Sequence, residues 1–310
     1  MSSPVIIQFV LLSVIIFISM MQTEAENSPE TSKCASLRVR RNIKSLSQAE
    51  LNEYVDAFKK AYEQRILDTM TRIHLADFLA THHQPMFLLY HRIFAFDFEE
   101  RLRKINPNVT IPYWDETDDS EYPHKSVIFS PEIFGGDGDP AHDYCVKEGF
   151  LKDVHLAHPT CKDCFGCVRR QFNGQDGAIK PFTPASVIDQ YIQNSPTFDE
   201  FRFWVEDSLH FQVHDGLGGR RGDMSSPTSS NDPFFYLHHS NMDRLHVKWA
   251  RLHPEAANRV NGLQEFFDDS DKVRSRVTYT NDTPIPYFNM TSGSILHTDR
   301  PPLCYTYDKI

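Results

Sequence analysis

Two groups of histidines contain the residues best suited to chemistry in this chain, which has 15 histidines in all. His210 and His214 are four residues apart, so on a helix both imidazole rings lie on one face, about one turn apart. Two side chains at this spacing can bind one metal ion. The adjacent pair His238 and His239 supplies a third imidazole from a later segment. Three imidazoles favour copper or zinc over magnesium or calcium.

The second group lies nearer the N-terminus and repeats this logic. His82 follows His74 by eight residues, and His91 follows His82 by nine. Two sets of three histidines in one helical core would form a dinuclear metal centre. Neutral imidazoles leave the positive charge on the metal ions, which favours a bound dianion such as peroxide. We therefore expect copper and dioxygen chemistry rather than hydrolysis by zinc.

These histidines need helices to position them, and the spacing of apolar residues predicts such helices. The expected helices span about residues 47–68, 91–105, 184–191, 198–214 and 232–253. On the last of them Asp243 lies one turn after His239, where it could orient a ligand imidazole through the free ring N–H. The expected fold is mainly α, with a four-helix-bundle core that houses a dicopper centre.

The remaining segments are predicted to be loops and short strands. Residues 115–185 are rich in Asp, Gly, Pro and Cys, which predicts long loops pinned by disulfides. Residues 277–310 contain short runs of Val, Thr, Tyr and Phe broken by Pro, which predicts a few strands. Hydrophobic residues make up 40% of the chain, as in a folded globular protein. The net charge of −10 argues against a nucleic acid partner.

The N-terminal 25 residues differ from the rest of the chain. Residues 5–21 are almost wholly apolar, and a polar stretch follows, so residues 1–25 are expected to be a signal peptide cleaved after Ala25. The alternative is a retained anchor, because a run of about 17 apolar residues approaches the minimum for a membrane span. Cleavage would leave a single catalytic domain of residues 26–310, secreted and with no membrane attachment.

The cysteines agree with an oxidising compartment. Six cysteines predict three disulfides. Cys161, Cys164 and Cys167 could also hold zinc, but disulfides are favoured in a secreted chain. Three glycosylation sequons, at Asn108, Asn281 and Asn289, are consistent with secretion. The tripeptide Arg221-Gly-Asp223 matches a cell-adhesion motif, although a three-residue match is weak.

Several motifs resemble those of tyrosinases and catechol oxidases. The stretch from His82 to the pair His91-Arg92 resembles their first copper motif. The second copper motif is matched by Glu206-DSL-His210-FQV-His214, Gly218-Gly219 and the run from Asp232 through His239 to Arg244. Further matches are Arg38, Arg40 and Arg41 at the start, Tyr113-Trp114-Asp115 after the first motif, and Tyr305-Thr-Tyr307 at the end. The resemblance covers the chain from about residue 34 onward.

This resemblance implies a ligand set and a reaction. Copper A would be bound by His74, His82 and His91, and copper B by His210, His214 and His239. Two copper ions would oxidise o-diphenols to o-quinones, with dioxygen as co-substrate and a small phenol as substrate.

The resemblance also implies roles beside the copper ligands. Glu206 would act as a base or hold a water for the hydroxylation of monophenols. Efficient monophenolases often have Asn where this chain has Phe211, so oxidation of diphenols is expected to be the main reaction.

The chain departs from the family pattern in two further places. Ala80 occupies the position where some members link a cysteine to the second copper A histidine, so His82 must be held by packing. The chain stops three residues after Tyr307, where many relatives continue into a shielding domain, so an open site is expected. The resemblance further implies a Cys34–Cys304 disulfide, with Cys145 paired within the cluster of residues 161–167 to a partner left open.

Three rival functions remain. One is a hemocyanin-like oxygen-binding protein, another a copper-free structural extracellular protein, and the third a zinc hydrolase. All six ligand positions being histidine argues against the copper-free protein, and the lack of an HExxH arrangement argues against the hydrolase.

Overall fold

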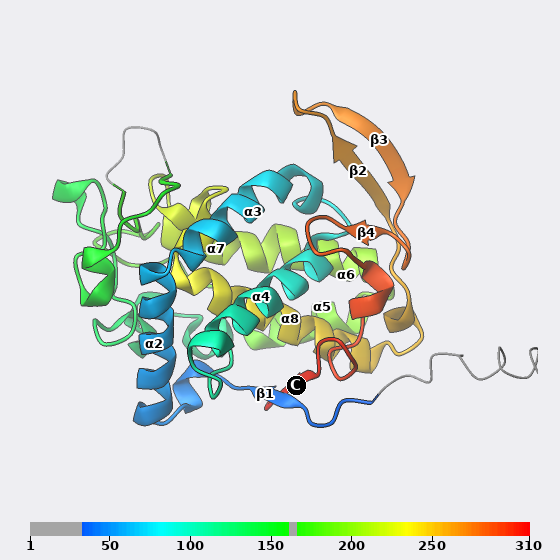
Figure 1. Cartoon of the computed structure of the whole chain (residues 1–310), viewed down its shortest axis with the longest axis horizontal. Coiled ribbons are helices and arrows are strands. Elements are labelled where there is room, and N and C mark those ends of the chain that lie inside the picture. Colours follow the sequence, from blue (N-terminus) through cyan, green and yellow to red (C-terminus); the bar gives the residue numbers. More distant parts are fainter. Residues whose placement is uncertain (1–32, 161–165) are drawn as a thin grey trace, which may run out of the picture. The chain divides into compact units, whose positions relative to one another are not determined.

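The computed structural model describes residues 33–160 and 166–310, so the expected signal peptide, Cys161 and Cys164 lie outside the described residues. Residues Ser36–Ile310 form one unit built mainly of helices. Figure 1 shows α3, α4, α7 and α8 running through the body of this unit. Among the helices of the described residues, none combines the length and the apolar character needed to cross a bilayer.

The first helical stretch is two helices rather than one. α2 (Gln48–Glu63) begins with a capping box in which Ser47 and Glu50 satisfy each other's backbone N–H groups. The chain then turns at Arg65, whose φ of 60° is left-handed, and α3 (Ile66–Thr81) follows. The prediction of a single helix over residues 47–68 was therefore wrong in its extent. The turn lets α3 carry His74 and end at His82.

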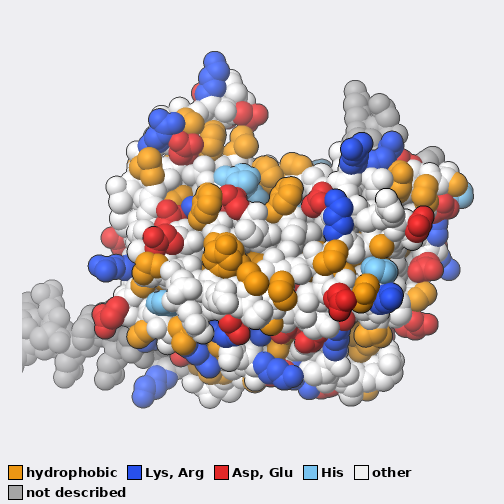
Figure 2. Space-filling view, turned by 180° about the vertical axis from the view of Figure 1, so that it is seen from behind, with side chains coloured by type: hydrophobic (Ala, Val, Ile, Leu, Met, Phe, Trp, Pro, Cys, Tyr) orange, Lys and Arg blue, Asp and Glu red, His pale blue; other side chains and the backbone are white. Residues whose placement is uncertain are grey.

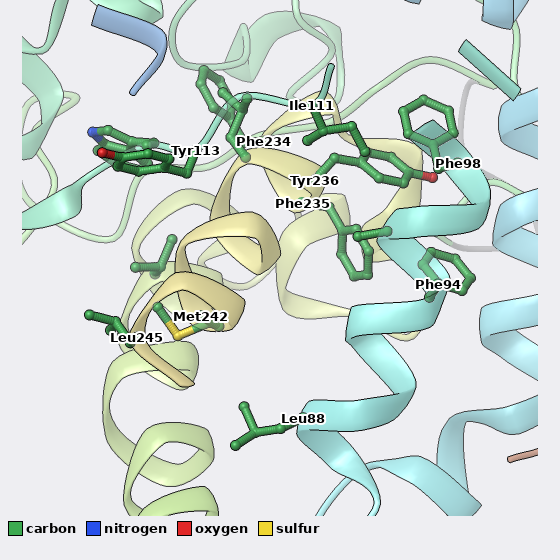
Figure 3. Packing of buried hydrophobic residues seen from close by; sticks show 14 of the residues in the cluster. Leu88, Phe94, Phe98, Ile111, Tyr113, Phe234, Phe235, Tyr236, Met242 and Leu245 are labelled. Carbon is green, nitrogen blue, oxygen red and sulfur yellow. The ribbon is translucent and has the colours of Figure 1, made fainter. Parts of the chain in front are cut away.

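The centre of the unit is the packing of α4 (Phe87–Ile105) against α8 (Pro233–Leu252). Asp232 caps α8 by accepting a hydrogen bond from Phe234 N, and α4 ends just before Asn106-Pro107, as expected. Between these helices, the rings of Phe98 and Tyr236 stack with centroids 3.8 Å apart, and Phe94 packs against Phe235 (Figure 3). This aromatic layer fixes α4 relative to α8, and both helices carry histidines.

The stretch expected to be one helix over 198–214 changes geometry along its length. α6 (Phe198–Trp204) passes without a break into a π-helical segment, Val205–His210, which continues as α7 (Phe211–Gly218). π turns inside helices are rare and occur mostly at functional sites. α5 (Ala185–Asn194) precedes this stretch and packs against α8.

The loop region has no α-helix or strand among its described residues before α5, only short 3₁₀ turns. These turns span Glu116–Asp119, Pro123–Lys125, Val127–Phe129, Pro140–His142 and Gly149–Asp153. A disulfide joins Cys145 to Cys167, which settles the partner of Cys145. The fully buried Arg170 forms an ion pair with Asp232 at 2.7 Å and so ties the loops to the start of α8.

The strands lie at the margins of the fold. β1 (Arg38–Arg40) pairs in parallel with β6 (Tyr305–Tyr307), and β4 (Pro284–Ile285) pairs with β5 (Met290–Thr291). Cys34 and Cys304 are each disulfide-bonded. A hairpin that the sequence did not predict, β2 (Leu263–Phe267) with β3 (Val273–Thr278), projects from the body in Figure 1. Gln264 anchors its base, because its amide donates to Ala80 O and accepts from Met86 N.

Candidate metal centre

The structure brings the expected histidines into two groups with metal-binding geometry. In each group the potential ligand nitrogens lie within 4.8 Å of one another. The first group is His74, His82 and His91, and the second is His210, His214, His238 and His239. The groups face each other. The rings of His91 and His239 stack with centroids 4.1 Å apart, and the ring centroids of His82 and His210 are 6.1 Å apart.

In the first group, each ring uses one nitrogen to bond to the backbone. Nδ1 of His74 donates to Pro227 O at 2.8 Å, that of His82 to Phe78 O at 3.0 Å, and that of His91 to Phe87 O at 2.9 Å. A neutral imidazole that donates from Nδ1 carries an unprotonated Nε2, which is the form that binds metal ions. His82 also stacks on Phe78 at 4.1 Å, so packing holds this ring in the absence of a thioether link.

Two of these unprotonated nitrogens point at each other. Nε2 of His74 lies 3.4 Å from Nε2 of His91, and both rings already donate from Nδ1. Two lone pairs at this distance repel unless a cation lies beside both. The arrangement therefore fits a bound metal ion.

In the second group, helix geometry places the HxxxH pair as expected. His210 ends the π segment and His214 lies on α7, with ring centroids 4.2 Å apart. Nδ1 of His214 donates to Met224 O. Nε2 of His210 and Nε2 of His214 are buried and have no hydrogen-bond partner in the described structure. Unsatisfied buried nitrogens are rare in folded proteins, and a metal ion would satisfy both.

The doublet His238-His239 offers two candidates for the third ligand of this group. Glu116 Oε1 lies 2.7 Å from Nδ1 of His238, and Nε2 of His238 is buried without a partner in the described structure, like those of His210 and His214. His239 has no partner at either nitrogen, and its ring stacks on His91. A ligand of a dinuclear centre must face the other set, so the geometry favours His239.

Burial keeps these imidazoles neutral. It lowers the pKa of His74 to about 4 and that of His214 to about 3, and it lowers the pKa values of His82, His91, His210 and His239 further below the ordinary range. The cause is loss of solvation of the charged ring, with repulsion between neighbouring rings added for most of them. Neutral rings with free Nε2 atoms are a donor set that fits copper.

Glu206 lies at the edge of the site. Its carboxylate connects the π segment to the turn that follows His82. Oε1 accepts a hydrogen bond from the backbone N–H of His83, and Oε2 forms an ion pair with Arg202 at 3.0 Å. Burial raises the pKa of Glu206 to about 7, although both contacts oppose the shift. Sequence reasoning missed Arg202 and His83 here. The i, i+4 spacing of Arg202 and Glu206 was a usable signal for the first, whereas the second is a long-range contact.

A cavity of about 390 Å³ leads from the surface to the histidines of both groups. Its walls include His82, His210 and His214, with Glu206 and Phe211. The side chain of Phe211 is 63% exposed at this opening. It offers an apolar ring and no hydrogen-bonding group where an asparagine would offer an amide.

Asp243 has different partners from those expected. Its Oδ1 accepts from Arg92 Nε, and its Oδ2 accepts from the hydroxyls of Tyr305 and Tyr307 at 2.6 Å. No bond to a histidine ring is formed, because the arginine and the two tyrosines take the carboxylate oxygens. Asp243 therefore joins α8 to α4 and β6, and it acts on His239 only through the helix.

Other histidines and motifs do not contribute to the centre. His246 is buried and accepts a hydrogen bond from Arg92, which is a packing role. Further histidines are at least partly exposed: His124, His142, His155, His158, His253 and His297. Asp223 of the adhesion-like tripeptide is fully buried, so it cannot be presented to a receptor.

Comparison with known proteins identifies the family. Residues 57–252 match the family model described as the common central domain of tyrosinase. This chain belongs to the tyrosinase family. As a member it is a copper-dependent oxidoreductase. The tyrosinase of Streptomyces antibioticus is 28% identical over 294 residues, which span 88% of this chain and 100% of that relative.

Solved structures of tyrosinases and related proteins share the fold of this chain. A polyphenol oxidase mutant from Thermothelomyces thermophila superposes with a TM-score of 0.63 at 20% identity, covering 96% of this chain and 95% of the other. A functional unit of octopus hemocyanin gives a TM-score of 0.59 at 20% identity, covering 88% of this chain and 68% of the other. The fold is thus shared with proteins whose names denote oxygen carriers as well as oxidases.

Proposed function

We propose that this chain is a secreted dicopper phenol oxidase of a single catalytic domain, residues 26–310, that converts o-diphenols to o-quinones with dioxygen. The observation that carries the proposal is the convergence of six buried imidazoles with free nitrogens at the end of an open cavity. His74, His82 and His91 would hold one copper ion, and His210, His214 and His239 the other. Two copper ions, when bound, supply the redox chemistry that passes electrons from two diphenols to one dioxygen, giving two quinones and two waters.

The residues of the chain supply position, dryness and access. Backbone carbonyls fix the rings of His74, His82 and His91, and the aromatic layer of α4 and α8 keeps water from the inner side of the site. The cavity gives a phenol-sized ring a path to His82 and His210. An oxygen carrier would need this path to be blocked, so the open cavity favours an oxidase.

Glu206 is the proton acceptor in this proposal. A pKa of about 7 suits a group that takes up a phenolic proton near neutral pH. Its oxygens are bonded to His83 N and Arg202, but a carboxylate has about four acceptor sites and can receive one more bond. Phe211 adds no polar group that could orient a water beside Glu206, which supports diphenol oxidation as the main reaction.

The test is copper analysis combined with turnover. Purified protein reconstituted with copper is expected to hold about two copper ions per chain and to turn 4-methylcatechol into quinone with uptake of dioxygen. Tyrosine should react more slowly than the catechol. Copper binding and dioxygen binding without catechol oxidation would point to an oxygen carrier, and failure to bind copper would exclude the ligand assignment.

A further inference from the structure

The charged side chains that line the cavity are all acidic. They are Glu206, Asp207 and Asp215, and among the described residues neither a lysine nor an arginine belongs to its lining. The charge of Glu206 is compensated by Arg202 from behind the wall. The two aspartates therefore dominate the electrostatic character of the cavity.

Within residues 33–160 and 166–310, no lysine or arginine forms an ion pair with either aspartate. Asp207 lies 3.3 Å from Nδ1 of His83, an exposed histidine, and its own side chain is 36% exposed. Asp215 accepts a hydrogen bond from the neutral amide of Asn173 at 2.7 Å. Lys180 lines an adjoining depression together with Phe211 and Asp215 rather than the cavity itself.

The spacing of these residues places two carboxylates around an aromatic ring. Asp207, Phe211 and Asp215 recur every four residues, and all three face the cavity. The same helical stretch carries His210 and His214, whose buried Nε2 atoms have no hydrogen-bond partner and mark the reacting end. On the face drawn in Figure 2, acidic and hydrophobic side chains lie beside a histidine that reaches the surface.

We propose that this cavity selects phenols that carry a positively charged amine on their side chain, over phenols that carry a carboxylate. The inference rests on the proposed function and names the substrate class for the same site. With the aromatic ring at the histidines, the side chain of the substrate extends toward the opening. An ammonium group there is attracted by Asp207 and Asp215 and can contact the face of Phe211. A carboxylate is repelled by the same two groups.

The size of the preference follows from the exposure of the aspartates. Partly exposed charges several ångströms apart interact weakly, so the expected preference is about tenfold in kcat/KM at low salt. Ions screen such charges, because the Debye length falls to about 8 Å at physiological ionic strength and 3 Å at 1 M. The preference should therefore shrink to about twofold at high salt.

The experiment compares three catechols of different charge on the copper-loaded full chain. They are dopamine, 3-(3,4-dihydroxyphenyl)propionate and the neutral 4-methylcatechol, to which the other two rates are normalised. The ratio of kcat/KM for dopamine to that for the propionate is expected to be about ten, to fall about threefold in Asp207→Asn, and to approach one in the double variant with Asp215→Asn. Glu132→Gln, which removes an exposed acid of the loop region, controls for the net charge of −10.

A binding measurement separates this inference from the proposed function. Phenethylamine and 3-phenylpropionate lack the catechol group, so ligand-detected NMR can measure their affinity without turnover. Amine-selective binding that Asp207→Asn weakens would support the inference even if no catechol is oxidised. An equal or reversed preference, or a preference that Glu132→Gln reduces as much as Asp207→Asn does, would overturn it while leaving catechol oxidation intact.

Discussion

The two halves of the metal centre are positioned by different means. In the second histidine group, local geometry positions His210 and His214, since they are one turn apart on a continuous helical stretch. The first group depends on contacts between distant segments. His82 lies at the end of α3, and His83 after it has a left-handed backbone with φ of 55°. Glu206 and Gln264 hold this turn from other parts of the chain.

This difference explains why the sequence predicts the geometry of the HxxxH pair, whereas for the first group it predicts the members but not the turn that positions them. A spacing of four residues fixes a geometry before the fold is known. A histidine in a turn can be placed only when its long-range partners are known. The comparison predicts that substitutions in the second histidine group affect the ligand atoms directly. Substitutions around the first group should act through the turn that contains His82.

The largest effect is expected at the doublet on α8. His239→Ala should remove one copper ion per chain and lower catechol oxidation by more than about a hundredfold, since changes beyond the ligands can already cost this much. His238→Gln is the matched control, because glutamine can still donate to Glu116 and should leave the copper content near two per chain. Copper analysis and quinone formation measure both. If His238→Gln loses copper while His239→Ala retains it, the ligand assignment within the doublet is reversed.

The next effect concerns Glu206, which bridges the halves, in the metal-free protein. Its pKa is about 7 in the folded chain and 4.5 without the fold, so folding favours the protonated carboxyl. The stability it contributes is fully present below pH 4.5 and is lost as the pH rises to 7. The loss is about 3 kcal/mol at most, from 1.4 kcal/mol per pKa unit. Glu206→Gln cannot ionise and should lack this loss.

Denaturant unfolding between pH 4.5 and 8 tests the prediction about Glu206. The free energy of unfolding of the wild type should fall relative to that of Glu206→Gln as the pH rises. Parallel pH profiles of the two proteins would show that burial does not shift the pKa of this carboxyl. Glu132→Gln, an exposed acid, should follow the wild type throughout.

A substitution at Gln264 tests directly how the first histidine group is positioned. Its side chain is fully buried, donates to Ala80 O at 2.8 Å and accepts from Met86 N at 3.3 Å, so it fixes the turn that contains His82. Gln264→Ala leaves these backbone groups unsatisfied and should cost about 2 kcal/mol of stability. It should also weaken binding of one copper ion more than of the other. Thermal unfolding and competitive copper titration measure the two effects, and uniform loss of both ions would contradict a local role.

The fold and the site were predictable to different depths. The start of the first helix near residue 47, the end of α4 and the HxxxH pair follow from local rules, and the structure agrees with them. The break at Arg65, the π segment and the β2–β3 hairpin were missed.

The apolar periodicity used to predict the helices does not encode any of these features. Asp243 is the clearest case at the site. Its predicted position on the helix was right. Its carboxylate, however, accepts hydrogen bonds from Arg92, Tyr305 and Tyr307 instead of orienting a histidine.

The smallest effect is expected at Phe211, which lies beside His210 on the helical stretch of the second group but contributes no ligand atom. Phe211→Asn would put an amide at the cavity opening near Glu206, where it could help orient a water for proton transfer from a monophenol. Because the side chain is 63% exposed, its replacement should change stability by less than about 0.5 kcal/mol. Tyrosine hydroxylation should rise a few-fold relative to catechol oxidation, at the scale of one added hydrogen bond. Phe211→Leu keeps the position apolar and should leave the ratio of the two activities unchanged. A rise in both variants would mean that the bulk of the ring, and not its lack of polarity, limits reaction with monophenols.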